Sequence, residues 1–278
     1  MAPRLFACFG RGAAAASSSR AAAADNPKHH QTTPEPATSE QSAPVVVELF
    51  SSQGCATSPE AELVVSRLGR GDFAAEVEGA AVVVLAFHVD YWDYMGWKDP
   101  YGGSQWTVRQ KAYVEALRLD TMFTPQVVVQ GTAQCVGTDQ EGMLGNIRAA
   151  ARCPAPSLQA TFQRPKAETL QVNITGSLRS KIDHQGVNVM VALYESGIVT
   201  DCQKGVNKGR VLSNDYVVRR LEKLCTLKDA SPKKTINVNI NFSLWEGFNS
   251  TKCGIVVFVQ NSSLQIFGSQ KFVLPENV

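Results

Sequence analysis

The chain has 278 residues, of which 44% are hydrophobic and 19% charged, and basic residues exceed acidic ones by 27 − 25 = 2. This is the composition of a globular protein of about two domains, if a domain takes about 150 residues, and its near-neutral charge excludes the basic footprint of a nucleic-acid-binding protein. The longest apolar run, at residues 80–87, is shorter than the roughly 18–20 residues that cross a bilayer, so we expect no membrane span.

Residues 1–43 are predicted to form a disordered tail, because they are rich in Ala, Ser, Pro and Gln and nearly lack aromatic residues. Arg4, Arg11 and Arg20 occur there among serines and without a preceding acidic residue, which also suits an organelle transit peptide. Both interpretations stay open. The apolar patch at residues 5–9 is too short for a secretory signal. We therefore expect a cytoplasmic or organellar protein, with the chloroplast as one location, and not a secreted one.

Strands and helices are predicted to alternate between residues 44 and 153. The predicted elements are, in chain order, a strand at 45–50, a helix at 59–68, a strand at 82–88, a helix at 104–119, strands at 126–130 and 133–136, and a helix at 140–151. This order matches the minimal thioredoxin-like unit, and the sequence CPAP at 153–156 ends it. We therefore expect an α/β thioredoxin-like domain over residues 44–153.

Residues 157–278 are predicted to form a β-rich domain. Apolar residues alternate with period two in this half of the chain, for example in LQATF at 158–162 and INVNI at 236–240. A two-sheet β-sandwich is the natural arrangement for such strands. Residues 215–224 suit either a short helix or an edge strand, and both interpretations stay open.

Cys55 lies where the first predicted strand gives way to a helix. Unpaired backbone N–H groups and the positive end of the helix dipole at such a point favour a thiolate over a thiol. Ser58 takes the place of the second cysteine of a Cys-x-x-Cys pair, so Cys55 could attack a disulfide but would need an external thiol to resolve the adduct. Ser58 either supports the thiolate with its hydroxyl or is a passive replacement.

The seven cysteines are odd in number and are never paired at metal-ligand spacing, which indicates a reducing compartment. Cys135 is a conceivable resolving thiol. Its expected place on a neighbouring edge strand puts it beyond disulfide reach of Cys55, for which the Cα–Cα limit is about 7 Å.

Four segments together carry a specific pattern: FSSQGC at 50–55, FHVDYWDYMGWKD at 87–99, FTPQ at 123–126 and GVNKGRVL at 205–212. They resemble the family of the domain of unknown function 1223 (DUF1223), in a plant-type member, over residues 44–278. The resemblance implies a thioredoxin-like fold. It also implies that Thr124 and Pro125 form a cis-proline element that faces the nucleophile and offers backbone to an extended substrate.

The run at 87–99 is predicted to form a ligand loop, because it follows a buried strand at the point where α/β sheets place such loops. His88, Asp90, Trp92 and Trp97 are its candidate substrate-binding residues. The alternative is a structural loop fixed by tryptophan packing. A His-x-Asp pair supplies too few ligands for a metal ion, so we expect no metal site.

Two functions fit these features. The first is a glutathione-linked thiol–disulfide exchange with Cys55 and Ser58 as the catalytic residues, protein or peptide disulfides as substrates, glutathione as co-substrate and no bound cofactor. The second is a non-catalytic module that binds a peptide or protein in the groove of a thioredoxin-like fold and with the loop at 88–99.

Overall fold

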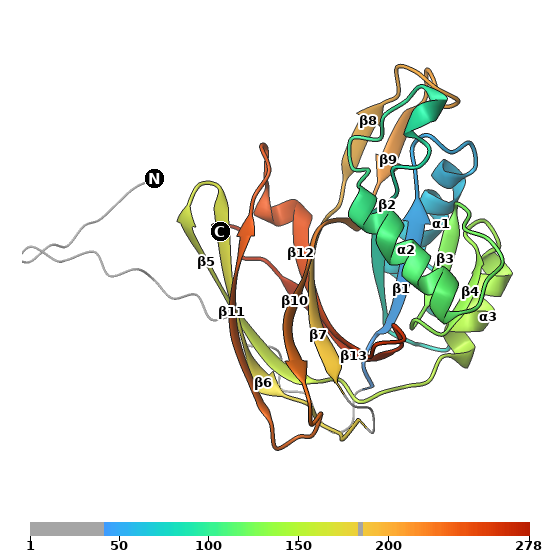
Figure 1. Cartoon of the computed structure of the whole chain (residues 1–278). Coiled ribbons are helices and arrows are strands. Elements are labelled where there is room, and N and C mark those ends of the chain that lie inside the picture. Colours follow the sequence, from blue (N-terminus) through green and yellow to red (C-terminus); the bar gives the residue numbers. More distant parts are fainter. Residues whose placement is uncertain (1–41, 183–185) are drawn as a thin grey trace, which may run out of the picture.

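The computed structural model describes residues 42–182 and 186–278 (Figure 1). Nearly all of the predicted tail, residues 1–41, lies outside the described residues. The last two residues assigned to the tail are ordered against the chain, since the Ala43 N–H donates to the Cys153 carbonyl at 2.7 Å and Ser42 forms a bridge with Pro154.

The helices of the described residues are α1 (Ser58–Arg70), α2 (Ser104–Ala116) and α3 (Gln140–Ala149), with the 3-10 turns η1 (Asp93–Met95) and η2 (Ser250–Lys252). The strands are β1 (Val45–Ser51), β2 (Val82–His88), β3 (Gln126–Val129), β4 (Ala133–Val136), β5 (Ser157–Lys166), β6 (Thr169–Ser177), β7 (Val187–Glu195), β8 (Ile198–Asp201), β9 (Val211–Asn214), β10 (Val217–Leu227), β11 (Thr235–Ser243), β12 (Cys253–Gln260) and β13 (Ile266–Val273). The elements predicted for the N-terminal half are confirmed, with small differences at their ends.

The strands form an eight-stranded mixed sheet in the order β13-β12-β7-β10-β2-β1-β3-β4, a three-stranded sheet in the order β11-β6-β5, and the β8–β9 hairpin. The large sheet takes strands from both halves of the chain. The predicted fold class, an α/β thioredoxin-like domain followed by a separate β-sandwich, is therefore wrong. The protein is predominantly β, with one sheet that runs through both halves. The division into folding units at residues 153 and 157 stays a prediction.

The pairing of β2 with β10 is the physical reason for this difference. In the predicted unit β2 would be an edge strand with unpaired backbone groups, which proteins rarely leave open. Here the Ala86 N–H donates to the Tyr216 carbonyl at 2.8 Å, and Val217 lies in parallel register with Ala86. β10 also pairs antiparallel with β7. Most of the segment 215–224 is therefore strand and not helix, and β10 stands between β7 and β2 in the sheet although it pairs with β2 at Val217 alone.

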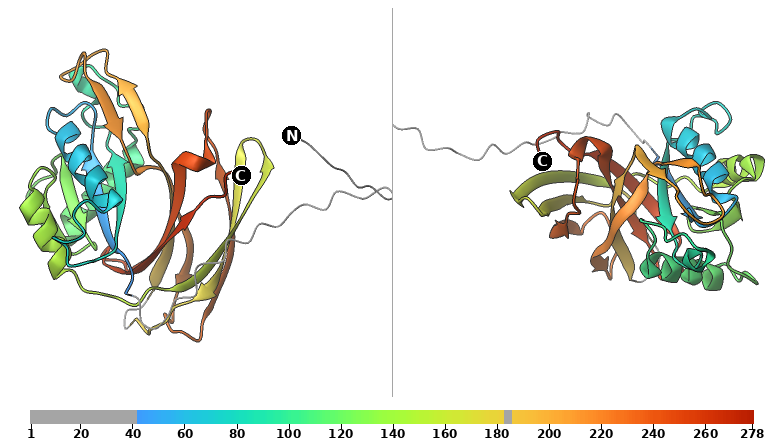
Figure 2. Two further views of the ribbon diagram at one scale, coloured as in Figure 1. Left: turned by 180° about the vertical axis from the view of Figure 1, so that it is seen from behind. Right: turned by 90° about the horizontal axis from the view of Figure 1, so that it is seen from above.

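The helices gather around the N-terminal part of the large sheet, with α1 and α2 on opposite sides of β1 and β2 (Figure 2). On one face, Val47 and Leu49 of β1 pack in a cluster with Val65 of α1 and Leu144 of α3. On the other face, Trp106 of α2 packs with apolar side chains of β1, β2, β10 and β12. Because β1 is buried on both faces, its sequence is apolar almost without interruption.

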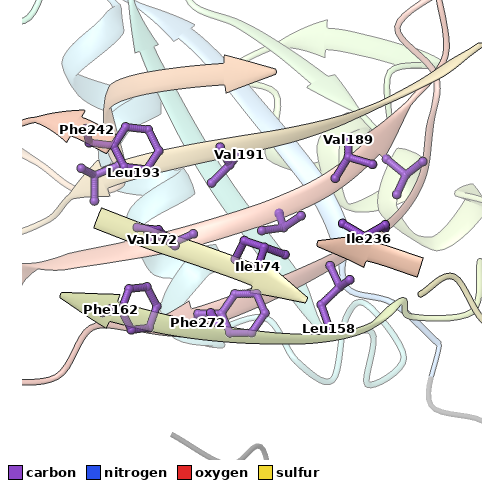
Figure 3. Close-up of a cluster of buried hydrophobic side chains, with 14 of the residues drawn as sticks. Leu158, Phe162, Val172, Ile174, Val189, Val191, Leu193, Ile236, Phe242 and Phe272 are labelled. Atoms are coloured by element: carbon purple, nitrogen blue, oxygen red, sulfur yellow. The ribbon is translucent and has the colours of Figure 1, made fainter. Parts of the chain in front are cut away.

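The C-terminal strands of the large sheet bury their other face against the three-stranded sheet (Figure 3). Val189 and Val191 of β7 share this cluster with Val172 and Ile174 of β6. Residues two apart in a strand point to the same side, so the period-two pattern places them all in this layer. One of the two layers in this half is therefore part of the sheet that continues into the N-terminal half, and the three-stranded sheet is the other.

A buried ion pair connects β1, α2 and β12. Arg109 Nε donates to Glu48 Oε1 at 2.7 Å, the Tyr113 hydroxyl donates to the other oxygen of Glu48, and Gln260 Nε2 donates to the Tyr113 hydroxyl at 3.2 Å. Burial opposes the charge of Arg109, but the Glu48 carboxylate raises the pKa of Arg109 above its ordinary value. The network thus fixes the two halves of the chain to each other.

Arg109→Met should destabilise the fold by about 3–5 kcal/mol, because it leaves Glu48 charged and unpaired in the interior. The free energy of unfolding in urea measures this loss. The double variant with Glu48→Leu should recover most of it, since it removes the stranded charge as well. Arg67→Met, which breaks an exposed pair with Asp72, should cost less than about 1 kcal/mol. Equal losses in the two single variants would contradict this account.

Candidate functional site

Cys55 lies in a loop between the end of β1 and the start of α1, and residues 52–57 are called the Cys55 loop. Helix α1 begins at Ser58 with Thr57 as its N-cap, so Cys55 precedes the helix and does not stand on its first turn. The sulfur still meets the helix start, because the Thr57 backbone N–H hydrogen-bonds to it. Such an N–H group carries the positive end of the helix dipole.

The Cys55 sulfur is enclosed by hydroxyl groups. Its side chain is 4% exposed, and burial by itself raises the pKa of a thiol. Hydrogen bonds from the side chains of Ser58, Thr124 and Thr57 outweigh burial and hold the pKa of Cys55 below its ordinary value. Thr57 Oγ1 lies 3.5 Å from the sulfur, and the Thr124 carbonyl oxygen, an acceptor for the thiol proton, lies 3.6 Å away.

Two of these hydroxyls are oriented by donors of their own. Ser58 Oγ accepts a hydrogen bond from the Ser52 N–H at 3.3 Å, and Thr124 Oγ1 accepts one from the Trp92 indole N–H at 2.6 Å. A hydroxyl that accepts one hydrogen bond keeps its own proton to donate. The contacts of Ser58 therefore favour thiolate support over passive replacement.

For the other cysteines of the described residues, the pKa of the thiol moves in the opposite direction. The pKa is raised in each, with burial as the first cause, at Cys135, Cys153, Cys202, Cys225 and Cys253. For Cys135, which pairs with Val127 across β3 and β4, the pKa is raised to about 11. None of the cysteines in residues 42–182 and 186–278 forms a disulfide. Cys55 is thus chemically set apart from the rest.

The peptide bond between Thr124 and Pro125 is cis, as the family resemblance implied. It lies at the start of β3, where Gln126 pairs with Phe50 of β1, so this turn is next to the Cys55 loop. Tyr91 lies near the same sulfur. Burial, together with the neighbouring Cys55, raises the pKa of Tyr91 to about 12, and its phenol stays protonated.

His88 is wholly buried between two carboxylates. Its Nδ1 lies 2.7 Å from Asp99 Oδ2, and its Nε2 lies 3.3 Å from Glu62 Oε1. Burial disfavours the charged ring, but Asp99 and Glu62 raise the pKa of His88 to about 10. Burial also opposes ionisation of Asp99, yet the imidazolium lowers its pKa. Because the His88 ring has no exposed surface, its charge acts inside the protein.

Asp99 also binds the backbone of the Cys55 loop. The oxygen that contacts His88 also accepts a hydrogen bond from the Gln53 N–H at 2.7 Å, and Oδ1 accepts one from the Tyr101 N–H at 2.9 Å. One buried carboxylate therefore fixes the backbone two residues before Cys55.

The other three predicted ligand residues of this segment also make internal contacts. Asp90 accepts a hydrogen bond from a threonine of α2 at 2.6 Å. Trp92 packs on the Cys55 loop so closely that a Cβ on Gly54 would lie 3.0 Å from the Trp92 Cβ. The Trp97 indole N–H donates to Gln53 Oε1 at 3.1 Å. Trp92 and Trp97 of the segment at 88–99 thus contact the Cys55 loop directly.

The β8–β9 hairpin brings the C-terminal half to the same place (Figure 1). Asn207 Nδ2 donates to the carbonyl oxygens of Gln53 at 2.8 Å and Cys55 at 2.9 Å. Gln53 Nε2 in turn donates to Thr200 Oγ1 at 3.0 Å and to Asn214 Oδ1 at 2.9 Å. The Cys55 loop is therefore held from both halves of the chain.

Sequence reasoning did not select Gln53 or Asn207 as site residues, and it included Asp99 only as part of the predicted ligand loop. A signal existed, because each stands inside one of the four segments that carry the family pattern. Their roles depend on contacts between segments that are far apart in the chain, and spacing alone does not show such contacts.

Across residues 42–182 and 186–278, no three or more His, Cys, Asp or Glu side chains are grouped so as to hold a metal ion. The helices of this part of the chain are all too short or too polar to cross a membrane.

These features define a mixed-sheet protein whose cysteine loop is fixed by both halves of the chain. Residues 46–260 match the sequence profile of the family described as "Protein of unknown function (DUF1223)". The chain belongs to this family, as its motifs indicated. None of the curated proteins matches it.

Two solved structures are similar. Protein AGR_C_4864 from Agrobacterium tumefaciens is 24% identical, with a TM-score of 0.59 over 86% of this chain and 97% of that chain. HBP35 of Porphyromonas gingivalis is 12% identical, with a TM-score of 0.54 over 84% of this chain and 76% of that chain. At these identities the likeness shows a shared fold alone.

The buried imidazolium should make stability fall as pH rises. The pKa of His88 in the folded protein, about 10, exceeds the unfolded value of about 6.5. Its contribution is therefore fully present below about pH 6.5 and is lost as pH rises toward about 10. Between these limits the free energy of unfolding in urea should fall more steeply for the wild type than for His88→Gln, whose side chain does not titrate. Parallel profiles would show that His88 is not held as a cation.

Proposed function

We propose that this protein is a monothiol enzyme of thiol–disulfide exchange, with Cys55 as its nucleophile and glutathione as the external thiol. The observation that carries the proposal is the place of the Cys55 sulfur at the start of α1, where hydroxyl groups face it and hold its pKa below the ordinary value. Among the cysteines of the described residues, Cys55 alone has a lowered pKa, and hydroxyl donors are the cause. The thiolate is the reactive form in such chemistry.

The reaction balances on a mixed disulfide between a protein thiol and glutathione. The Cys55 thiolate attacks the glutathione sulfur, the disulfide bond breaks, and the protein leaves as a thiolate. A second glutathione thiolate then attacks the glutathione sulfur of the adduct, so that glutathione disulfide leaves and the Cys55 thiolate is restored. The net reaction releases the protein thiolate and uses one external glutathione, which leaves as glutathione disulfide together with the glutathione of the mixed disulfide, and no bound cofactor is needed.

The neighbours of Cys55 have distinct roles in this reaction. Ser58 donates to the thiolate and cannot close a disulfide with it, so the adduct waits for the external thiol. Thr124, whose hydroxyl and carbonyl both face the sulfur, and Pro125 border the path of an extended disulfide partner. Trp92 holds the Thr124 hydroxyl in place.

The cellular location forms part of the same proposal. Free thiols and resolution by glutathione suit a reducing compartment, so we keep the cytoplasm or an organelle such as the chloroplast as the location. We also propose that the protein is a plant-type member of this family.

A second candidate function is a non-catalytic module that holds a peptide or protein. Two observations favour it. Cys55 is almost fully buried, and two apolar side chains of η1 are exposed, Tyr94 at 78% and Met95 at 44%. The Tyr94 ring stacks on that of Trp92, with 6.4 Å between the centroids. Apolar groups that project in this way suit contact with a partner.

Alkylation by iodoacetamide, followed by peptide mass spectrometry, should give Cys55 a pH midpoint below the ordinary thiol value of about 8.5. Ser58→Ala should raise that midpoint, because the thiolate loses a hydrogen bond that the thiol does not need. The matched control is Ser66→Ala, a serine of the same helix whose hydroxyl bonds to Asp215. An unchanged midpoint in Ser58→Ala would remove the role given to Ser58.

Cys55→Ser should reduce the glutathione-dependent reduction of a glutathionylated peptide to background, because a serine hydroxyl is not a nucleophile without a base. Cys135→Ser should retain the activity, since its thiol has a raised pKa. Ser58→Cys should add dithiol reduction of insulin. Full activity in Cys55→Ser would show that Cys55 is not the nucleophile, whereas a wild type without activity would favour the binding module.

A further inference from the structure

A small pocket lies beside the Cys55 loop, between α1 and β9. Its volume is about 80 Å³, and its walls include Ser51 at the end of β1, Glu62 and Leu63 of α1, Arg210, and Val211 of β9. The proposed exchange reaction uses none of these side chains. The volume exceeds the share of one water molecule in the liquid, about 30 Å³.

The inner wall of this pocket carries polar atoms without partners. Glu62 is 2% exposed, and neither of its carboxylate oxygens has a hydrogen-bond partner among the described residues. One of them lies 3.3 Å from His88 Nε2, but without hydrogen-bonding geometry. The buried hydroxyl of Ser51 also lacks a partner in this part of the chain. Buried polar groups are nearly always satisfied, so these atoms point to a ligand that supplies donors.

Charge is also unbalanced at this wall. The carboxylates of Glu62 and Asp99 face a single imidazolium, that of His88, which leaves one formal negative charge in excess. Arg210 lines another part of the pocket, and its guanidinium donates from Nη1 to Asn207 Oδ1 at 2.8 Å. A guanidinium has four further N–H donors beside that one. The pocket therefore has a carboxylate oxygen without a partner, Oε2 of Glu62, on one side and the basic residue Arg210 on the other.

We propose that this pocket binds the free α-amino acid group of a small ligand, as found at the γ-glutamyl end of glutathione, with the ammonium at Glu62 and the carboxylate at Arg210. A simple cation would meet repulsion from Arg210, and a simple anion would meet repulsion from Glu62. A group that carries both charges complements both walls. The exposed side chains of Leu63 and Val211 offer apolar contact to the rest of the ligand. The proposed function enters only through the choice of glutathione as the natural ligand.

Calorimetric titration with S-methylglutathione tests the site, because this probe keeps the α-amino acid end but has no thiol to react with Cys55. The wild type and Cys55→Ser should bind it equally. N-acetylation of the probe removes the ammonium and should weaken binding by at least about tenfold, the loss expected for one hydrogen bond to a charged group. Equal binding of the two probes, or no binding of either, would overturn the proposal and leave a pocket filled with water.

Variants of the two walls give a second measure. Glu62→Gln and Arg210→Gln should each weaken binding of S-methylglutathione by at least about tenfold, whereas Arg67→Gln, on the same helix but paired with Asp72, should not change it. Arg210 is exposed, so its variant keeps the test decisive even where Glu62→Gln does not fold. Unchanged binding in Arg210→Gln would overturn the proposal. If the wild type bound S-methylglutathione but did not catalyse thiol–disulfide exchange, that result would count against the proposed function and not against the pocket.

Discussion

The parallel contact between β2 and β10 joins the two halves of the protein into one sheet. It consists of a single register pair, Ala86 with Val217, and a hydrogen bond from the Ala86 N–H to the Tyr216 carbonyl. Because β10 is fixed beside β2, the β8–β9 hairpin that precedes it is held at the end of β1 where the Cys55 loop begins. The contacts that Asn207 makes with that loop depend on this placement.

The polar side chains around Cys55 mostly bind one another. His88 is held by Asp99 and Glu62, and Asp99 holds the Gln53 backbone, so the charge of the imidazolium is already paired with two carboxylates. The Cys55 sulfur is left to hydroxyl and backbone donors. These donors hold the pKa of Cys55 below its ordinary value, so a larger share of the thiol is ionised at a given pH.

Local signals in the sequence were enough for the N-terminal elements and for the position of Cys55. The unbroken apolar run of β1 and the proline at the start of α1 are properties of neighbouring residues. The joining of the two halves was not predictable in this way. In β10, Arg219 looked like a residue of an exposed edge, but its charge is paired with Glu195 and its guanidinium lies 4.3 Å from the Trp245 ring centroid. These partners are distant in sequence, so no spacing rule reveals that the strand is internal.

Asn207 lies 152 residues after the Cys55 carbonyl that it holds. Contacts across so long a stretch of chain form late in folding, because the entropy of loop closure must be overcome first. During synthesis the β8–β9 hairpin also emerges from the ribosome only after the whole N-terminal half. Until then the carbonyls of Gln53 and Cys55 and the Nε2 group of Gln53 lack these partners. The loop around Cys55 therefore gains its last contacts only when most of the chain has been made.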